Sequence, residues 1–153
     1  MTVIMTGIAK HRTVLIPAYM SFITAFCIPA VVSRIIASTD KYYDLPDGTY
    51  PAFDFIRSQP AKMSAKLTWT VGLLEEHGNA LRMPYSEHLD DGIFQLRAIQ
   101  GHDIARVLYF FVVGRKIILT HGFVQDTAKT PQYEIERAKK YREEYLNRNS
   151  EEA

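Results

Sequence analysis

The sequence predicts an α+β domain in which a helical hairpin packs on a curved antiparallel sheet and a C-terminal helix follows. Three observations give this fold class. Apolar residues recur at helical spacing up to about residue 78, and from Gly92 onward the period changes to the alternation of strands. Three strand-like segments then follow one another with short connections, which favours an antiparallel meander. After Pro131, a charged segment with a partly apolar stripe predicts the last helix.

The chain has 153 residues, 47% of them hydrophobic and 23% charged, as is typical of a globular protein with one domain. We divide it into an apolar extension over residues 1–37, a domain over residues 38–148 and a polar tail over residues 149–153. The single cysteine, Cys27, cannot form an intramolecular disulfide, which fits a reducing compartment, and we expect the protein in the cytoplasm. From Ser38 onward, 15 Lys and Arg residues stand against 17 Asp and Glu, so RNA binding would need a local cluster of cations.

The extension contains an uncharged segment over residues 14–33 with basic residues on both sides. A segment of this length just reaches across a bilayer, and its flanks also resemble those of a signal peptide. Pro17 and Pro29 interrupt it, which argues against a membrane span. Three interpretations stay open: an extension from a misplaced start codon, a membrane anchor or signal, and a packed extra helix. We expect contact with a membrane only if the segment is a real anchor.

The domain begins with a possible first strand within residues 34–43. The stretch LPDGTYP then indicates a turn. Thr49 is the expected N-cap of a short helix, with Pro51 in its first turn and its end near Ser58.

A second helix is expected to begin at Pro60 and to end at Gly78. We expect Trp69 to help seat the two helices on the sheet. The apolar stripe of this helix consists of Met63, Leu67, Val71 and Leu74.

The strands are predicted over residues 92–99, 104–113 and 116–123, with a tight hairpin turn at Gly114 and Arg115. The first strand alternates, so Gln95 and Arg97 share its polar side. The second is apolar on both sides except at Arg106, which indicates a central strand.

A cation inside an apolar strand is costly unless it is paired or solvated. For Arg106, one explanation is a structural ion pair with Asp103 or a helix carboxylate. The alternative is a groove on the sheet in which Arg97 and Arg106 hold a phosphate through their guanidinium groups. The sequence leaves both open.

His121, near the end of the third strand, is a candidate proton-transfer group beside that groove, or a packing residue. Tyr109 is a core residue or an RNA-stacking residue. Arg115, Lys116 and Lys129 are either a solvated surface or candidate RNA-binding cations. No Cys or His pair has metal-ligand spacing and no nucleotide-binding motif is present, so we expect neither metal nor cofactor.

Several ordered motifs in this region resemble the HigB-like branch of the RelE/ParE toxin superfamily, whose members are often described as phage-derived toxins. They are FQLR at 94–97, RVLYF at 106–110, HGF at 121–123 and KTP at 129–131. The turn and double helix upstream also fit, so that the resemblance covers about 100 residues and leaves out residues 1–37. It implies a RelE-like fold.

The resemblance further implies a ribosome-dependent, metal-independent endoribonuclease that cuts mRNA and is neutralised by a helix-turn-helix antitoxin. Arg97 and Arg106 match positions of catalytic or phosphate-binding cations, and His121 or Tyr109 would move the proton. Fixed guanidinium groups would stabilise the charge that develops on the phosphate.

The chain departs from the family pattern at two places. Gln125 and Asp126 stand where the family usually has two lysines, and Gln95 replaces a usual Glu, which brings the catalytic strength into question. Two other functions therefore stay open. One is inhibition of DNA gyrase by binding, as in the ParE branch, and the other is a degenerate toxin that only binds an antitoxin.

Overall fold

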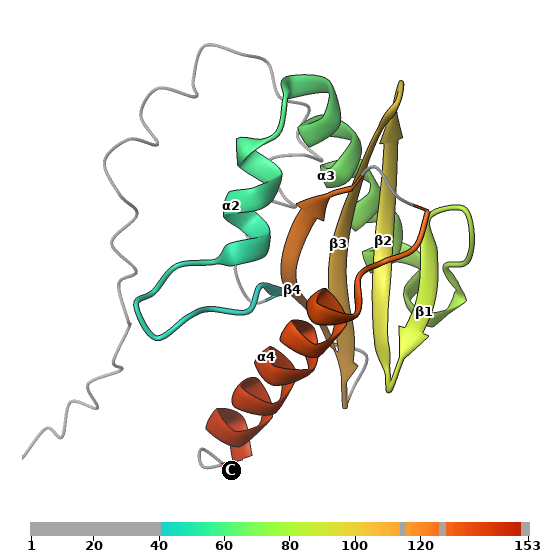
Figure 1. The fold of residues 1–153 in the computed structure, drawn as a ribbon. Helices are drawn as coiled ribbons and strands as arrows, with labels where there is room; N and C mark the ends of the chain where they lie inside the picture. The colour runs from blue at the N-terminus through green and yellow to red at the C-terminus, as the bar shows by residue number, and fades with distance from the viewer. Residues whose placement is uncertain (1–40, 114–115, 126–127, 151–153) are drawn as a thin grey trace, which may run out of the picture.

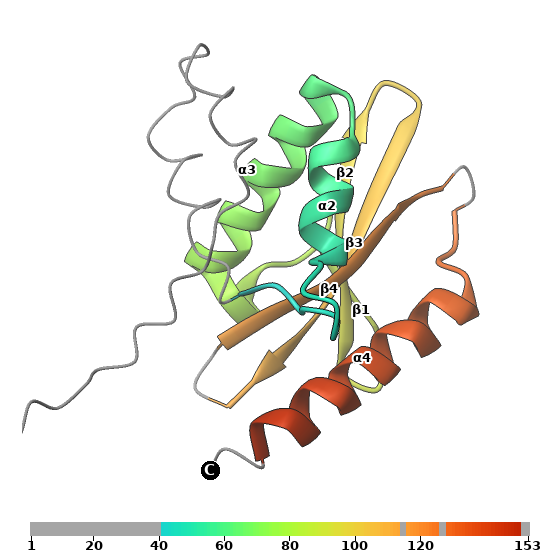
Figure 2. The same cartoon turned by 90° about the vertical axis from the view of Figure 1, so that its left-hand side faces the viewer.

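A computed structural model describes residues 41–113, 116–125 and 128–150 (Figure 1). Within them, four strands form one antiparallel sheet in the order β1-β2-β3-β4. The helices α2 and α3 cover one face of this sheet, and α4 crosses the other (Figures 1 and 2). The predicted α+β class, antiparallel sheet and C-terminal helix are confirmed. The elements are α2 (Pro51–Ser58), α3 (Ala61–His77), the 3-10 turn η3 (Gly78–Ala80), β1 (Ser86–Asp90), β2 (Ile93–Gln100), β3 (Asp103–Val112), β4 (Lys116–Val124) and α4 (Gln132–Ser150).

Local sequence explains where the helical hairpin begins and ends. Pro51 lies in the first turn of α2 as predicted, but the N-cap is Tyr50, which makes no side-chain capping bond. Thr49 is not the cap, because its N–H and hydroxyl both donate to Asp47 Oδ1, at 2.9 and 2.7 Å, and so stabilise the preceding turn. Gly78 ends α3 at φ +52°, a conformation that favours glycine.

The α2/α3 face of the sheet holds an apolar core, and the whole predicted stripe of α3 is buried in it. Gly122 of β4 lies against the Phe55 ring, and a Cβ at that position would overlap the ring. Trp69 was expected to help seat the two helices on the sheet. It does contact the Tyr85 ring, in a T-shaped arrangement, but it is 50% exposed and is not part of the buried core. The core on this face includes Met63, Leu67, Val71, Leu74, Leu96, Val107, Tyr109 and Leu119.

Strand β1 was not predicted. Only Ser86 of its five residues is buried, so no alternation marks it. The described end of the possible first strand is a parallel bridge of Tyr42 to Leu119, in which Tyr43 N–H donates to the Leu119 carbonyl at 2.9 Å. The extension 1–37, the turn at Gly114 and Arg115 and the end of the tail lie outside the described residues.

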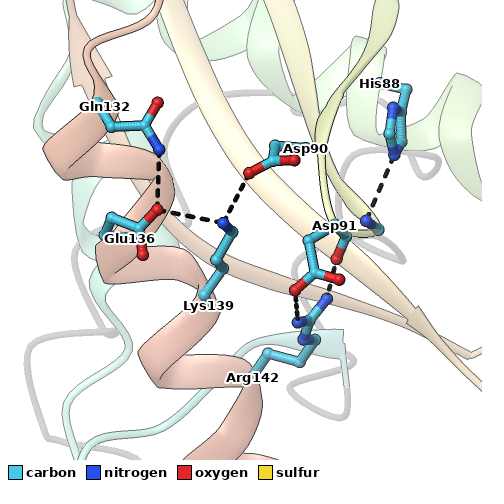
Figure 3. A network of polar contacts seen from close by, with 8 residues as sticks. His88, Asp90, Asp91, Gln132, Glu136, Lys139 and Arg142 are labelled. Atoms are coloured by element: carbon cyan, nitrogen blue, oxygen red, sulfur yellow. Dashed lines mark hydrogen bonds and ion pairs between the residues drawn. The ribbon is translucent and has the colours of Figure 1, made fainter.

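A second core cluster lies between the sheet and α4, and polar contacts fix the helix to the β1–β2 turn (Figure 3). Lys139 Nζ donates to Asp90 Oδ2 at 2.7 Å, and Arg142 Nη2 donates to Asp91 Oδ2 at 2.6 Å. These contacts fix the direction of α4. The N-terminal end of α4 and the residues before it then lie over the end of the sheet that carries buried polar side chains. Among the residues that the structure describes, no helix is long and apolar enough to cross a membrane.

Candidate functional site

The candidate site is built on Arg106, which lies on the α4 face of the central strand β3 and is 1% exposed. Its Nη1 donates to Gln95 Oε1 and to Thr130 Oγ1, both at 2.9 Å. Its Nη2 donates to the Ala128 carbonyl, also at 2.9 Å. These bonds attach the segment between β4 and α4 to the sheet and hold the guanidinium group in one orientation.

The bonds of Arg106 continue to the surface through Gln95. Thr130 Oγ1 donates to Gln95 Oε1 at 2.5 Å, and Gln95 Nε2 donates to Glu87 Oε2 at 2.6 Å. The three acceptors of Arg106 named above are neutral, and Asp103 lies instead beside α3 residues on the other side of the sheet. Asp103 is therefore not the partner that the ion-pair explanation suggested.

Arg97 on β2 lies directly opposite Arg106 across the β2–β3 ladder, so the two arginines share one face. Arg97 is partly buried, and its Nη1 lies 3.9 Å from Met83 Sδ. Within the described part of the chain, its buried Nε has no hydrogen-bond partner. Two neighbouring cations repel each other, and this pair forms a local positive site on a domain of low net charge.

The electrostatics of Arg106 follow from this arrangement. Burial lowers the pKa of its guanidinium, the charge of Arg97 lowers it further, and Glu87 opposes both. A guanidinium group nevertheless stays protonated in proteins. Arg106 is therefore a buried positive charge in a fixed position, which an anion at Arg97 would stabilise.

His121 lies on the same face but under α4, and is 2% exposed. Its Nε2 lies 2.9 Å from Glu134 Oε2, and its Nδ1 lies 3.2 Å from Thr120 Oγ1. Burial, with a smaller contribution from Arg137, lowers the pKa of His121 to about 3. Burial also raises the pKa of Glu134.

The hydrogen bonds indicate the protonation state of this pair. The Thr120 hydroxyl donates to the Leu108 carbonyl at 3.0 Å, so His121 Nδ1 is the donor to Thr120 Oγ1. Nε2 of the neutral imidazole then accepts, so this contact is a hydrogen bond when Glu134 carries its proton, the form that the raised pKa of that carboxyl group favours. His121 thus fastens α4 to the sheet in this arrangement.

Tyr109 does not join the arginines. It lies on the α2/α3 face, is 1% exposed, and its hydroxyl lies 2.6 Å from Ser86 Oγ. Burial raises its pKa. The proposal of a proton-transfer role for Tyr109 is therefore corrected, because the sheet itself separates it from Arg97 and Arg106.

The predicted RNA-binding cations are dispersed. Lys129 is exposed and lies between Ala128 and Thr130, next to the Arg106 bonds. Lys116 lies at the opposite end of the sheet, with its Nζ 5.8 Å from the centre of the Tyr145 ring. Arg115 is outside the described residues, and so is Asp126.

The sequence had not assigned roles to Thr130, Glu134 and Ala128. The only available signal was the position of Gln95 two residues before Arg97, which places both on one side of the strand. Among the described residues, no group of three or more His, Cys, Asp or Glu side chains is arranged to hold a metal ion.

These features define a small α+β domain with an arginine pair as its candidate anion-binding site. The family described as "Phage derived protein Gp49-like (DUF891)" matches residues 54–143, more than half of the chain. The chain therefore belongs to this Gp49-like, phage-derived family. The match includes both arginines, His121 and most of α4. None of the curated proteins with which the chain was compared matches it.

Proposed function

We propose that this chain is the toxin of a type II toxin–antitoxin pair, a HigB-like protein with a RelE-like fold that cleaves mRNA on the ribosome without a metal ion. The observation that carries the proposal is the placement of Arg97 and Arg106 opposite each other on one face of the sheet. Membership of a phage-derived family supports it. A helix-turn-helix antitoxin is the proposed partner, and it would cover this face.

The reaction would use the RNA itself as nucleophile. The 2′-oxygen forms a bond to the neighbouring phosphorus, the bond from phosphorus to the 5′-oxygen breaks, and a cyclic phosphate and a 5′-hydroxyl result. The 2′-hydroxyl loses a proton and the leaving oxygen gains one. Negative charge grows on the phosphate oxygens in between, and preorganised donors stabilise such charge most effectively.

The two arginines would stabilise this negative charge in different ways. Arg97, the more accessible, would bind the phosphate, and Arg106 would add a fixed positive charge behind it. Lys129 would extend the positive surface along the RNA backbone. His121 remains the proposed proton-transfer group, which would require it to leave Glu134.

A second candidate is a domain that binds an antitoxin without cutting RNA. The observation in its favour is that the guanidinium group of Arg106 donates hydrogen bonds to Gln95, Thr130 and Ala128 of its own chain. In that case the arginine pair would hold a carboxylate of the antitoxin rather than a phosphate. Inhibition of DNA gyrase is a further form of this non-catalytic function.

Induction of the full chain in bacterial cells, followed by mapping of mRNA 5′ ends, tests the proposal. We expect new ends within translated mRNA, growth arrest, and suppression of both by the helix-turn-helix protein encoded next to the toxin. Arg97→Ala should reduce both the new mRNA ends and the growth arrest, whereas Lys140→Ala, on the exposed side of α4, serves as a matched control and should not. Growth arrest without new mRNA ends would support gyrase inhibition. No arrest, but a stable complex with the antitoxin, would support the binding module.

A further inference from the structure

An exposed aromatic side chain lies on the outer surface of α3. Trp69 is the only tryptophan of the chain and is 50% exposed. Its neighbours one turn away on the helix are Ala65, Lys66, Gly72 and Leu73. Ala65 and Gly72 are too small to cover an indole ring, Leu73 packs against the core, and the Lys66 ammonium group donates to the Ile99 carbonyl. Core packing buries the opposite stripe of α3, and within the part of the chain that the structure describes it leaves the Trp69 side chain half exposed.

Contacts around the edge of the sheet connect Trp69, on the α3 side, to Arg97, whose side chain lies on the α4 side. The Trp69 and Tyr85 rings meet edge to face, with centroids 5.5 Å apart. The Tyr85 carbonyl accepts the Arg97 N–H at 2.8 Å, and Arg97 Nη1 lies 3.9 Å from Met83 Sδ. Met83 is 55% exposed. We name Trp69, Met83 and Tyr85 the edge patch: Met83 and Tyr85 lie where the chain enters the edge strand β1, and Trp69 contacts Tyr85 from α3.

The chemistry of the edge patch favours a nucleobase. It combines an open indole ring, a polarisable thioether and a guanidinium group, and Arg82, which is exposed, directly precedes Met83. The cations of Arg82 and Arg97 complement a phosphodiester backbone, and exposed aromatic rings beside cations bind unpaired bases by stacking. The nearby carboxylate of Glu87 accepts a hydrogen bond from Gln95 and lies on the side of the sheet away from α3.

We infer that the edge patch is a stacking site for an unpaired base of the RNA strand whose phosphate Arg97 holds. The inference rests on the proposed function and adds to it a contact that selects single-stranded RNA. The base lies against the Trp69 ring and the thioether of Met83, and the adjacent phosphate lies at Arg97. This contact is sequence-tolerant, because every base presents a π-face.

The test uses the purified full chain and a short single-stranded oligoribonucleotide. Trp69 is the sole source of tryptophan fluorescence, so a stacked base should quench that emission directly. An abasic strand of the same length provides the same phosphates without bases and should leave the emission nearly unchanged. Affinity is measured in parallel by fluorescence anisotropy of labelled RNA. This second measurement can also be made on variants that lack the tryptophan.

Four variants separate stacking from charge and from folding. Trp69→Ala should weaken binding of the base-bearing strand about tenfold, the lower part of the range for a lost stack, without affecting the abasic strand. Trp69→Phe keeps a ring and should retain most of the affinity. Arg97→Ala should weaken both strands. Leu146→Ala, an exposed apolar residue of α4, is the matched control and should change neither.

The outcomes distinguish this inference from the proposed function. RNA that binds in an Arg97-dependent manner, without quenching and without loss in Trp69→Ala, overturns the edge patch and leaves the proposed function intact. Absence of any binding to free single-stranded RNA also overturns the patch, whereas cleavage is judged separately on ribosome-bound mRNA. Quenching by the antitoxin but not by RNA would show that the edge patch binds protein, and would equally overturn the inference.

Discussion

The two faces of the sheet are built from different chemistry. The α2/α3 face is filled with aliphatic and aromatic side chains, and Tyr109 and Ser86 bond to each other there. The α4 face has a smaller apolar cluster and then, toward the end of the sheet, buried polar side chains, three of which (Arg106, His121 and Glu134) can carry a charge. These polar groups are Gln95, Arg106, His121, Thr130 and Glu134.

The difference separates stability from function within one small domain. Burial of apolar surface stabilises a fold without regard to direction, whereas a buried guanidinium group is costly and needs several well-placed acceptors. We therefore expect substitutions on the α2/α3 face to act on the free energy of unfolding and those around the arginines to act first on activity.

The largest effect is expected for Leu67→Ala on the α2/α3 face. Leu67 is fully buried, and a cavity of this kind costs about 2–5 kcal/mol of unfolding free energy. Urea unfolding measures it, with Leu146→Ala on the exposed side of α4 as the matched control. A loss as small as that of the control would show that this face does not dominate stability.

Helix α3 on this face could be predicted from the sequence because a repeating apolar pattern marks it. The stripe that contains Met63 and Leu67 recurs at helical spacing, and it is buried as predicted. Strand β1 has no such pattern, because its edge position leaves its side chains mostly exposed. An edge strand with one buried residue looks like a loop in sequence.

The candidate site could be predicted from the sequence only in part, for a related reason. Arg106 is held by Ala128 and Thr130, which follow it in the sequence by 22 and 24 residues. A contact between residues so far apart leaves no local repeat in the sequence from which it could be predicted. Tyr109 could have been excluded, because three positions from Arg106 in a strand means the opposite face. His121 could not have been placed this way, since the β3–β4 register shifts between Leu108 and Tyr109.

The second prediction concerns the α4 face. Arg106→Ala should reduce mRNA cleavage by about 10²–10³-fold, which corresponds to roughly 3–4 kcal/mol of transition-state stabilisation. It should also lower thermal stability, because Gln95 and Thr130 lose a donor. Cleavage and melting are therefore measured together, with Arg106→Lys as a variant that keeps the charge.

An Arg106→Ala protein that melts like its parent but does not cleave would support the site. A protein that is inactive only because it is unfolded would instead support a structural role for Arg106. Full activity of Arg106→Ala, Arg97→Ala and His121→Ala would show that the assigned site is wrong.

The third prediction is a pH dependence of stability from His121 and Glu134. The pKa of His121 is lowered from 6.5 to about 3, so between these values the unfolded chain binds a proton that the folded chain refuses. Stability therefore falls as the pH falls through this window, by up to about 1.4 kcal/mol per pH unit. The pKa of Glu134 is raised above 4.5, so its contribution is present below pH 4.5 and is lost as the pH rises through its folded pKa.

The two contributions oppose each other above pH 4.5, and only that of His121 continues to change below it. We expect His121→Gln to flatten the loss of stability between about pH 4.5 and 3, relative to the parent, and Glu134→Gln to steepen the curve above pH 4.5. Urea unfolding at a series of pH values measures both. Parallel curves for parent and His121→Gln would mean that His121 is protonated in the folded protein and so pairs with an ionised Glu134.

The smallest effect is expected at positions 125 and 126, where the chain departs from the family pattern. This prediction compares the two faces by their charge rather than by their packing. Gln125→Lys with Asp126→Lys removes one negative charge and adds two positive charges in the segment that leads to Ala128 and Lys129. Among the described contacts, the double variant loses the bond from Gln125 Nε2 to the Lys129 carbonyl, at 2.6 Å, which lies near the surface. If RNA binds to this face, the double variant should cleave ribosome-bound mRNA severalfold faster at low salt, and the gain should shrink as salt rises, because the added contacts are to phosphates. The matched control is Lys140→Gln on the exposed side of α4, which should leave the salt dependence unchanged. An unchanged rate in the double variant at every salt concentration would show that the RNA does not pass this segment, and that the lysines missing from this chain are not what limits its activity.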